Sequence, residues 1–291
     1  MWIRLFYAEW QKIIGNRWVT IGMIWIFPFT ALVLMIFALI GATFSESFRE
    51  GMQVDPAQWT EMAMFPWFIP NNPLGRGLLL GFTAVIFAGE YQWNTWKMIV
   101  PRSRRIPLIL IKFLAVAVFV IYAFMLMSIL MALGFRLISW VAGSPYGPEI
   151  SFPVISEFCR DYALQMLYAF TSTVIASGFA AIAAMVTRSI LGSAIAAIII
   201  GIAETALILP LFLLSWLLDS DLPMHLYRFI PAYNLLNLFS WLVGETPGGL
   251  TFPSGEVIVD SLPFAMTVVS CWIVGLIALT TYLFQKQDIT N

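Results

Sequence analysis

Charged residues are scarce in this chain of 291 amino acids, in which Asp, Glu, Lys and Arg together make up only 11% of the residues. Soluble domains usually carry about 25% charged residues. Apolar residues make up 60% of the chain, and the mean hydropathy is +0.88. A water-soluble fold of this length cannot bury so much apolar surface. The composition therefore predicts an integral membrane protein, because lipid accepts the apolar faces that water rejects.

Residues that support metal or nucleophilic chemistry are also few. His225 is the one histidine, and Cys159 and Cys271 are the two cysteines. Zinc sites and Ser-His catalysis depend on clusters of such side chains, so we expect no catalytic residues and no metal site in this chain. The net charge of −1 says nothing about a nucleic-acid partner, but basic residues form no run outside one loop, and we expect no nucleic-acid partner.

A phosphate-binding loop is missing as well. The chain has four lysines, and none of them stands in the GxxxxGK[ST] pattern that cradles the phosphates of ATP. The four lysines are Lys12, Lys97, Lys112 and Lys286. If ATP drives this protein, the nucleotide must bind to another chain.

Six long apolar segments predict an all-α fold with six transmembrane helices in one domain that covers residues 1–291. Roughly 20 apolar residues are needed to cross a bilayer, and each segment is expected to be helical because lipid leaves no partner for an unpaired backbone group. The predicted spans are 18–43, 75–95, 106–138, 162–186, 190–218 and 262–284.

The first 16 residues predict a separate helix that lies in the membrane interface. Trp2, Phe6 and Ile13 recur at helical spacing, whereas Arg4 and Lys12 fall toward the other side. The alternative is that this segment extends the first span inward. Gly15 and Asn16 favour a break between the two.

The distribution of basic residues predicts that both termini are cytoplasmic, in a multi-pass protein of the cell membrane. With this orientation ten of the 15 basic residues lie on the inner side, as the positive-inside rule requires. The five on the outer side are Arg49, Arg76, Arg136, Arg160 and Arg228. The last outer loop, 219–261, contains an apolar stretch broken by Pro231, which we expect to form re-entrant helices.

Glu204 is the one acidic residue deep in a predicted span. A charge at the bilayer centre costs roughly 2.5–3.5 kcal/mol on insertion scales, so such residues usually face protein or water. One interpretation places Glu204 on a transport path or at a subunit interface. The other is a protonated carboxyl that forms a structural hydrogen bond to a neighbouring helix, with Thr205 as a candidate partner.

Small residues recur every four positions in the same span, at Ser193, Ala197 and Gly201. This spacing allows two helices to approach closely. Helix packing is therefore the expected role of these three residues.

The segment 90–112 contains the only substantial inner loop, with basic residues and two prolines. Such a loop can rest on lipid headgroups, or it can dock a cytosolic partner. Its candidate docking residues are Glu90, Thr95, Lys97, Pro101, Ser103, Arg104 and Arg105.

This segment resembles the loop after the second span of ABC type 2 permeases. That family has a Glu near the end of the span, then Gly-Thr, then Pro, a small hydroxyl residue and Arg, and a Lys that opens the third span. The matching residues here are Glu90, Thr95, Pro101, Ser103, Arg104 and Lys112, while Asn94 stands where Gly is common. The closing run from Phe284 to Ile289 is similar to the family's aromatic–basic–Asp ending.

The resemblance implies the transmembrane subunit of an exporter similar to the G-type transporters. Two such subunits pair, as a homodimer or with a related chain, and the 96–105 segment of each couples to one of two ATP-binding-cassette subunits. ATP and Mg would then bind to the partner subunits and not to this chain. An amphipathic or hydrophobic substrate such as a peptide, lipid or drug-like molecule is expected.

Two other classes of membrane protein offer alternative functions for this chain. An intramembrane enzyme needs paired acids or a nucleophile with a base at membrane depth, and only Glu204 qualifies. An ion-coupled secondary transporter typically uses several intramembrane ionisable groups and inverted repeats, neither of which is visible. The ATP-driven permease is therefore the preferred interpretation.

Overall fold

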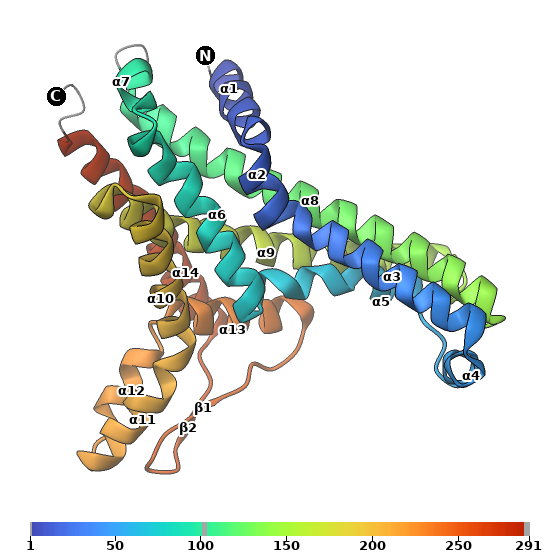
Figure 1. The fold of residues 1–291 in the computed structure, drawn as a ribbon. Helices are drawn as coiled ribbons and strands as arrows, with labels where there is room; N and C mark the ends of the chain where they lie inside the picture. Colours follow the sequence, from blue (N-terminus) through green and yellow to red (C-terminus); the bar gives the residue numbers. More distant parts are fainter. Residues whose placement is uncertain (1, 101–103, 288–291) are drawn as a thin grey trace.

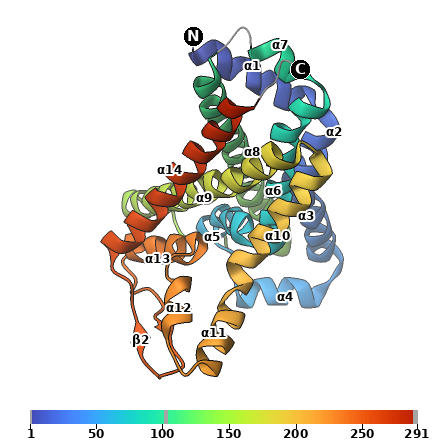
Figure 2. The same ribbon diagram turned by 90° about the vertical axis from the view of Figure 1, so that its left-hand side faces the viewer.

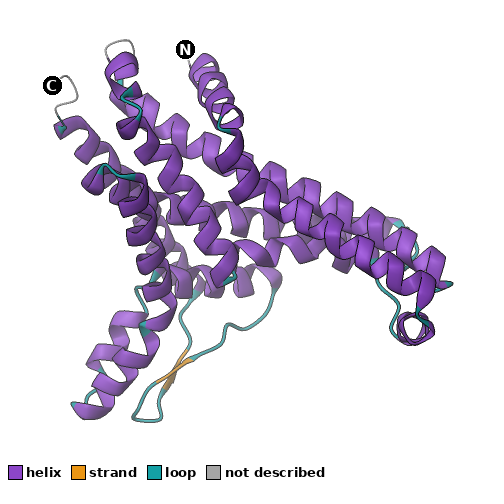
Figure 3. Cartoon of the chain, viewed as in Figure 1, coloured by secondary structure: helices purple, strands orange, loops and turns teal. Residues whose placement is uncertain are grey.

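The chain folds into a long helical bundle, seen here in a computed structural model that describes residues 2–100 and 104–287. Figure 3 shows that helices make up nearly all of it and that the strands form one short hairpin. The elements, in order, are α1 (Trp2–Gly15), α2 (Arg17–Thr20), η1 (Ile21–Trp25), α3 (Ile26–Phe44), α4 (Glu46–Val54), α5 (Trp59–Met64), η2 (Phe65–Asn71), α6 (Pro73–Gln92), α7 (Thr95–Ile99), α8 (Arg105–Ala142), α9 (Phe152–Thr187), α10 (Ile190–Ala206), α11 (Ile208–Leu217), α12 (Leu222–Tyr227), α13 (Pro231–Val243), β1 (Leu250–Thr251), β2 (Val257–Ile258) and α14 (Leu262–Lys286).

Four helical segments within the described residues are long and apolar enough to cross a membrane. They are Ile21–Phe44, α8, α9 and α14, and the pair α10–α11, bent by 51°, passes the same test as a fifth. α6 has 20 residues but is less apolar, because it carries Arg76, Glu90 and several glycines. The protein is thus a multi-pass helical membrane protein, and the count of six spans stays a prediction.

The helices pack around α6, α8 and α9. α8 lies along α3, α6 packs against α9 and α10, and α14 packs against α9 and α13. The first buried cluster joins α1, α3, α6, α8 and α9 through side chains such as Phe82, Phe119 and Phe124. Many apolar side chains on the outer faces of these helices remain exposed, such as Phe37 and Ile199, as expected of helices that face lipid.

The two ends of the bundle differ. Both termini and α7 lie together at one end, which we call the terminus end, and the β1–β2 hairpin with α11 and α12 lies at the opposite end, the hairpin end (Figures 1 and 2). At the hairpin end, Arg228 Nε donates to Asp260 Oδ1 at 3.0 Å. Because Asp260 is buried, this ion pair ties α12 to the segment that leads into α14.

Several segments expected to be loops are helical. The predicted outer loop 44–74 contains α4, α5 and η2, while α8 continues to Ala142 and α9 begins at Phe152. Local capping explains part of this: the Ser45 hydroxyl accepts a hydrogen bond from the backbone N–H of Phe48, which satisfies an orphan donor of α4. The predicted span 190–218 is broken at Leu207, between α10 and α11.

Candidate functional site

A cluster of four charged side chains lies at the terminus end, with Glu9, Glu90 and Lys112 buried and Lys12 partly exposed. Lys112 Nζ, on α8, is 2.8 Å from Glu90 Oε1 on α6 and 2.8 Å from Glu9 Oε2 on α1. Lys12 Nζ lies 2.6 Å from Glu9 Oε1 and 3.0 Å from Glu90 Oε1. The Lys112 side chain is 1% exposed. The two cations and two anions neutralise one another, and the cluster joins α1 to α6 and α8.

The environment of Lys112 supports its charge. Its ammonium group donates to the Ile86 carbonyl at 3.3 Å and lies 5.3 Å from the ring centroid of Trp96, within the range of a cation–π interaction. Burial alone would raise the pKa of Glu9, but the adjacent Lys112 and Lys12 outweigh it and hold the pKa of this carboxyl below its usual value. Glu9 therefore remains charged at neutral pH, and its stabilising effect is lost only as the pH falls below the ordinary carboxyl range.

α7 is fixed to the bundle by polar contacts of Thr95 and by aromatic contacts of Trp96. Asn94 adopts a left-handed conformation with φ 55° and turns the chain between α6 and α7, a geometry that Asn tolerates better than most residues. The Thr95 hydroxyl then donates to the Glu90 carboxylate. Trp96 is 1% exposed, and its ring lies 4.5 Å from that of Phe284 on α14. α7 is thus packed against α6, α8 and α14.

The predicted docking residues have different surroundings. Lys97 and Arg104 are exposed, whereas Glu90 is buried in the charge cluster. Arg105 Nη1 donates to the carbonyls of Phe284 at 2.9 Å and Gln285 at 2.7 Å. A cation at the last carbonyls of a helix is favourable, so Arg105 caps α14. Pro101 and Ser103 lie outside the described residues.

The C-terminal residues that are described are tied to two other helices. Gln287 Nε2 donates to the Met185 carbonyl near the end of α9 at 2.8 Å. Tyr91 at the end of α6 donates to Gln287 Oε1 at 2.5 Å. The α9–α10 turn at Arg188, with φ 52°, therefore lies at the same end as α7. Asp288 and Ile289 of the closing motif lie outside the described residues.

Glu204 forms a buried ion pair with Arg76, which joins α10 to α6. Arg76 Nη2 donates to Glu204 Oε2, and Arg76 Nη1 donates to the Ser172 hydroxyl on α9 at 3.3 Å. The side chains are 9% and 5% exposed. The Thr205 hydroxyl donates instead to the Ile202 carbonyl. Arg76 was counted above among the outer basic residues. It lies inside the bundle, where Glu204 compensates its charge.

A cavity of about 910 Å³ opens beside this ion pair. It lies between α6, α10 and α13, and most of its lining is apolar. Its polar lining residues are Arg76, Tyr168, Thr205, Tyr227 and Tyr233, and its apolar ones include Leu80, Ile198 and Leu235.

The small residues of α10 lie on its buried face. Ser193 and Ala197 are 0% exposed, and Ala197 packs with Leu80 and Ala84 of α6 and with Ala176 and Ala180 of α9. A Cβ atom placed on Gly201 would lie 2.6 Å from Leu80 Cδ1. A larger side chain there would push α10 away from α6.

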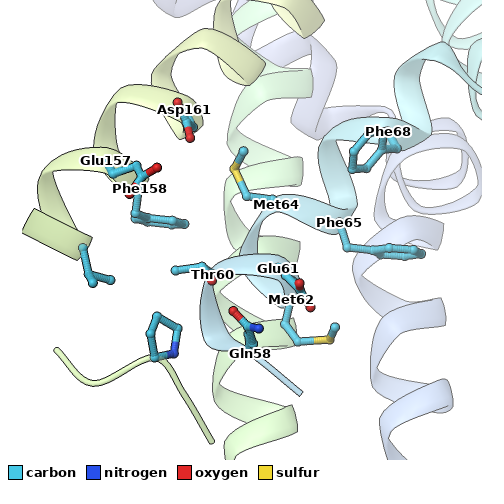
Figure 4. Close-up of a pocket in the computed structure, with 12 residues that line it drawn as sticks. Gln58, Thr60, Glu61, Met62, Met64, Phe65, Phe68, Glu157, Phe158 and Asp161 are labelled. Carbon is cyan, nitrogen blue, oxygen red and sulfur yellow. The ribbon is translucent and has the colours of Figure 1, made fainter. Parts of the chain in front are cut away.

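A second pocket, of about 670 Å³, lies between α5, η2 and the start of α9. Figure 4 shows Glu157, Phe158 and Asp161 from α9 on one side and residues of α5 and η2 on the other. Across residues 2–100 and 104–287, no group of three or more His, Cys, Asp or Glu side chains is placed to hold a metal ion.

Sequence reasoning missed the roles of Trp96, Lys12 and Arg76. The presence of a large aromatic residue, Trp96, in a short basic loop could have indicated its packing role, because such a ring has a large apolar surface that is usually buried. The Arg76–Glu204 pair had a weaker signal, since each residue is an isolated charge within an otherwise apolar part of its helix. Their pairing depends on how α6 and α10 cross, which a single sequence does not reveal.

These features define a class of protein: a multi-pass helical membrane protein with a charge-stabilised helical segment at one end and an apolar cavity within the bundle. The family model for "ABC-2 family transporter protein" matches residues 5–151, just over half of the chain. The chain therefore belongs to the ABC-2 transporter family, and it is a membrane-spanning permease component that is not itself the ATPase. A comparison with individual curated proteins finds no match.

Proposed function

We propose that this chain is the permease subunit of an ATP-driven exporter that moves an amphipathic or hydrophobic substrate out of the cell. Two permease subunits, identical or related, would assemble with two ATP-binding-cassette subunits that hold ATP and Mg. The observation that carries this proposal is α7, a short cationic helix fixed to α6, α8 and α14 through Trp96 and Glu90. Coupling of ATP hydrolysis to transport requires such an element, because the movement of the closing ATPase subunits must be transmitted to the spanning helices through rigid contacts.

The proposed topology has six spans, with both termini and α7 in the cytoplasm. α6 serves as the second span even though it is less apolar than the others, since its Arg76 is paired and Glu90 lies in the charge cluster. The bent pair α10–α11 forms the fifth span, and α12 and α13 form the re-entrant segment. Among the described residues, the acids Glu9 and Glu90 near the terminus end are buried and paired. The charged residue of α7 is the exposed Lys97, so the exposed charge of α7 is positive.

Labelling of single cysteines tests this topology. In a background with Cys159 and Cys271 replaced by serine, we expect Asp55→Cys and Glu149→Cys to react with an impermeant maleimide in intact cells. Lys97→Cys should react only after permeabilisation, because α7 faces the cytoplasm. Labelling of Lys97→Cys in intact cells, with Asp55→Cys and Glu149→Cys protected, would reverse the orientation.

ATP dependence tests the function itself. Because the chain lacks a phosphate-binding loop, we expect the purified chain neither to bind nor to hydrolyse ATP. Hydrolysis and transport should appear in proteoliposomes only when the ATPase subunit is added, and an ATPase variant lacking its phosphate-binding lysine should support neither. The neighbouring gene or a co-purifying protein identifies that ATPase.

An ion-coupled secondary transporter is the second candidate, and the buried Arg76–Glu204 pair is the observation that favours it. Ionisable groups at membrane depth commonly mark ion or proton paths. The same proteoliposomes distinguish the two functions. Transport by the chain alone under an ion gradient, without ATP, would select the secondary transporter.

A further inference from the structure

The large cavity between α6, α10 and α13 has one charged residue, Arg76, among the described residues of its lining. Of the two members of the ion pair, Arg76 lines the cavity, and Glu204 is not among the described residues that form its wall. The other polar groups of the wall are neutral hydroxyls, which belong to Tyr168, Thr205, Tyr227 and Tyr233. The volume of about 910 Å³ lies within the usual range for sites that enclose small molecules.

The guanidinium of Arg76 is partly paired within the bundle. Its Nη1 and Nη2 atoms bind Ser172 and Glu204, while the buried Nε has no hydrogen-bond partner among the described residues. Glu204 Oε1 is likewise buried without a described partner. A buried N–H left without a partner costs about 1–3 kcal/mol, and more for a charged group. Nε itself has almost no accessible surface, so an occupant of the cavity meets Arg76 through the charge of its guanidinium and not through this donor.

The rest of the wall favours a hydrocarbon chain. Leu78 and Leu80 of α6, Ile198 of α10, and Leu235 and Leu236 of α13 surround the space next to Arg76. An acyl or alkyl chain placed along these side chains loses its exposure to water, and each buried CH₂ contributes about 0.8 kcal/mol. The wall therefore combines a cationic group at one place with an extended apolar surface.

We propose that this cavity binds an amphiphile with an anionic head group, such as a carboxylate or phosphate, and an alkyl chain. The head group lies beside the Arg76 guanidinium, and the chain lies between α6, α10 and α13. Resting on the proposed exporter function, this assigns the substrate class: anionic amphiphiles in preference to cationic ones. The bound molecule can be a free fatty acid or an anionic phospholipid, since both offer the same chemistry.

Photolabelling of the chain in nanodiscs of phosphatidylcholine tests the proposal without any ATPase. The probes are a 16-carbon fatty acid with a diazirine in its chain, a phosphatidylglycerol with the same labelled chain, and a quaternary ammonium compound with that chain as the cationic control. Labelled peptides are identified by mass spectrometry. We expect at least one anionic probe to label 74–81 and 194–205 about tenfold more than the cationic probe, which corresponds to 1.4 kcal/mol of preference. The anionic probe that labels more strongly identifies the source of the ligand.

Variants assign the preference to Arg76. In Arg76→Gln/Glu204→Gln both charges disappear without a large change of volume, and anionic labelling should fall to the level of the cationic probe. Glu204→Gln alone leaves Arg76 without its carboxylate, so anionic labelling should be kept or increase. The exposed pair Arg160 and Asp161, 3.7 Å apart, supplies the matched control Arg160→Gln/Asp161→Asn, which should label as the parent does.

Equal labelling of the unmodified chain by anionic and cationic probes would overturn the proposal, and this result requires no variant to fold. Unchanged anionic labelling of Arg76→Gln/Glu204→Gln would overturn it as well. The outcome is separable from that of the exporter function. Anionic labelling without ATP-driven transport refutes only the exporter, and ATP-driven transport of cationic amphiphiles without anionic labelling refutes only this inference.

Discussion

Replacing Lys112 with methionine is expected to destabilise the protein by about 3–5 kcal/mol, the usual effect of removing one partner from a buried charge pair. Lys112 is 1% exposed and lies between Glu9 and Glu90. Without it, two buried carboxylates face each other with only the half-exposed Lys12 to compensate them. The measurement is the free energy of unfolding in mixed micelles titrated with dodecyl sulfate.

A triple variant separates the loss of charge balance from the loss of packing. In Glu9→Gln/Glu90→Gln/Lys112→Met no acid of the cluster remains, and the amide introduced at position 90 keeps an oxygen that accepts from Thr95. Most of the lost stability should return, because a neutral buried group costs far less than an unpaired charge. If the free energy of unfolding of Lys112→Met lies within about 1 kcal/mol of the parent value, Lys112 is not needed to compensate the two buried carboxylates.

The fold class could be predicted from the sequence because it depends on composition and on the length of apolar runs. The 11% of charged residues and runs such as those of α3, α8 and α14 predict membrane helices whatever their contacts. The family resemblance rested on Glu90, Thr95 and Lys112, and the match of residues 5–151 to the ABC-2 family confirms the family.

Contacts between distant segments could not be predicted, since hydropathy does not encode which helices meet. Glu9 and Glu90 are far apart in the chain, and both bind Lys112 only because α1, α6 and α8 converge at the terminus end. The guanidinium of Arg105 donates to carbonyls at the end of α14, 179 and 180 residues away, a contact that the sequence did not indicate, while its docking role stays a prediction. The helices of 44–74 were missed because that segment is too polar to resemble a span.

These contacts determine which residues are suitable for testing the docking of α7. Reversing Arg105 would break the cap of α14, so a loss of assembly would have two explanations. Lys97 and Arg104 are exposed, and within the described residues neither forms an ion pair. Their reversal therefore changes the surface charge next to α7 while the buried contacts of Trp96 and Glu90 are kept.

The double variant Lys97→Glu/Arg104→Glu is expected to weaken binding of the ATPase subunit at least about tenfold and to reduce its dependence on salt. Charges at such a surface accelerate association and fix the register of docking, so reversing two of them is expected to remove this electrostatic contribution. The dissociation constant is measured at low and high salt with the permease in phosphatidylcholine nanodiscs. Neutral lipid removes the attraction of basic residues to anionic headgroups, about 1 kcal/mol per residue.

Arg136→Glu/Arg160→Glu is the matched control, because it makes the same change in net charge at two exposed residues of α8 and α9, away from α7. It should bind the ATPase within about twofold of the parent if the effect is local to α7. Equal weakening in both variants would indicate a general effect of net charge. Normal binding and normal transport by Lys97→Glu/Arg104→Glu would show that α7 is not the docking element. ATPase closure would then reach α6 and α8 without the positive charges next to α7.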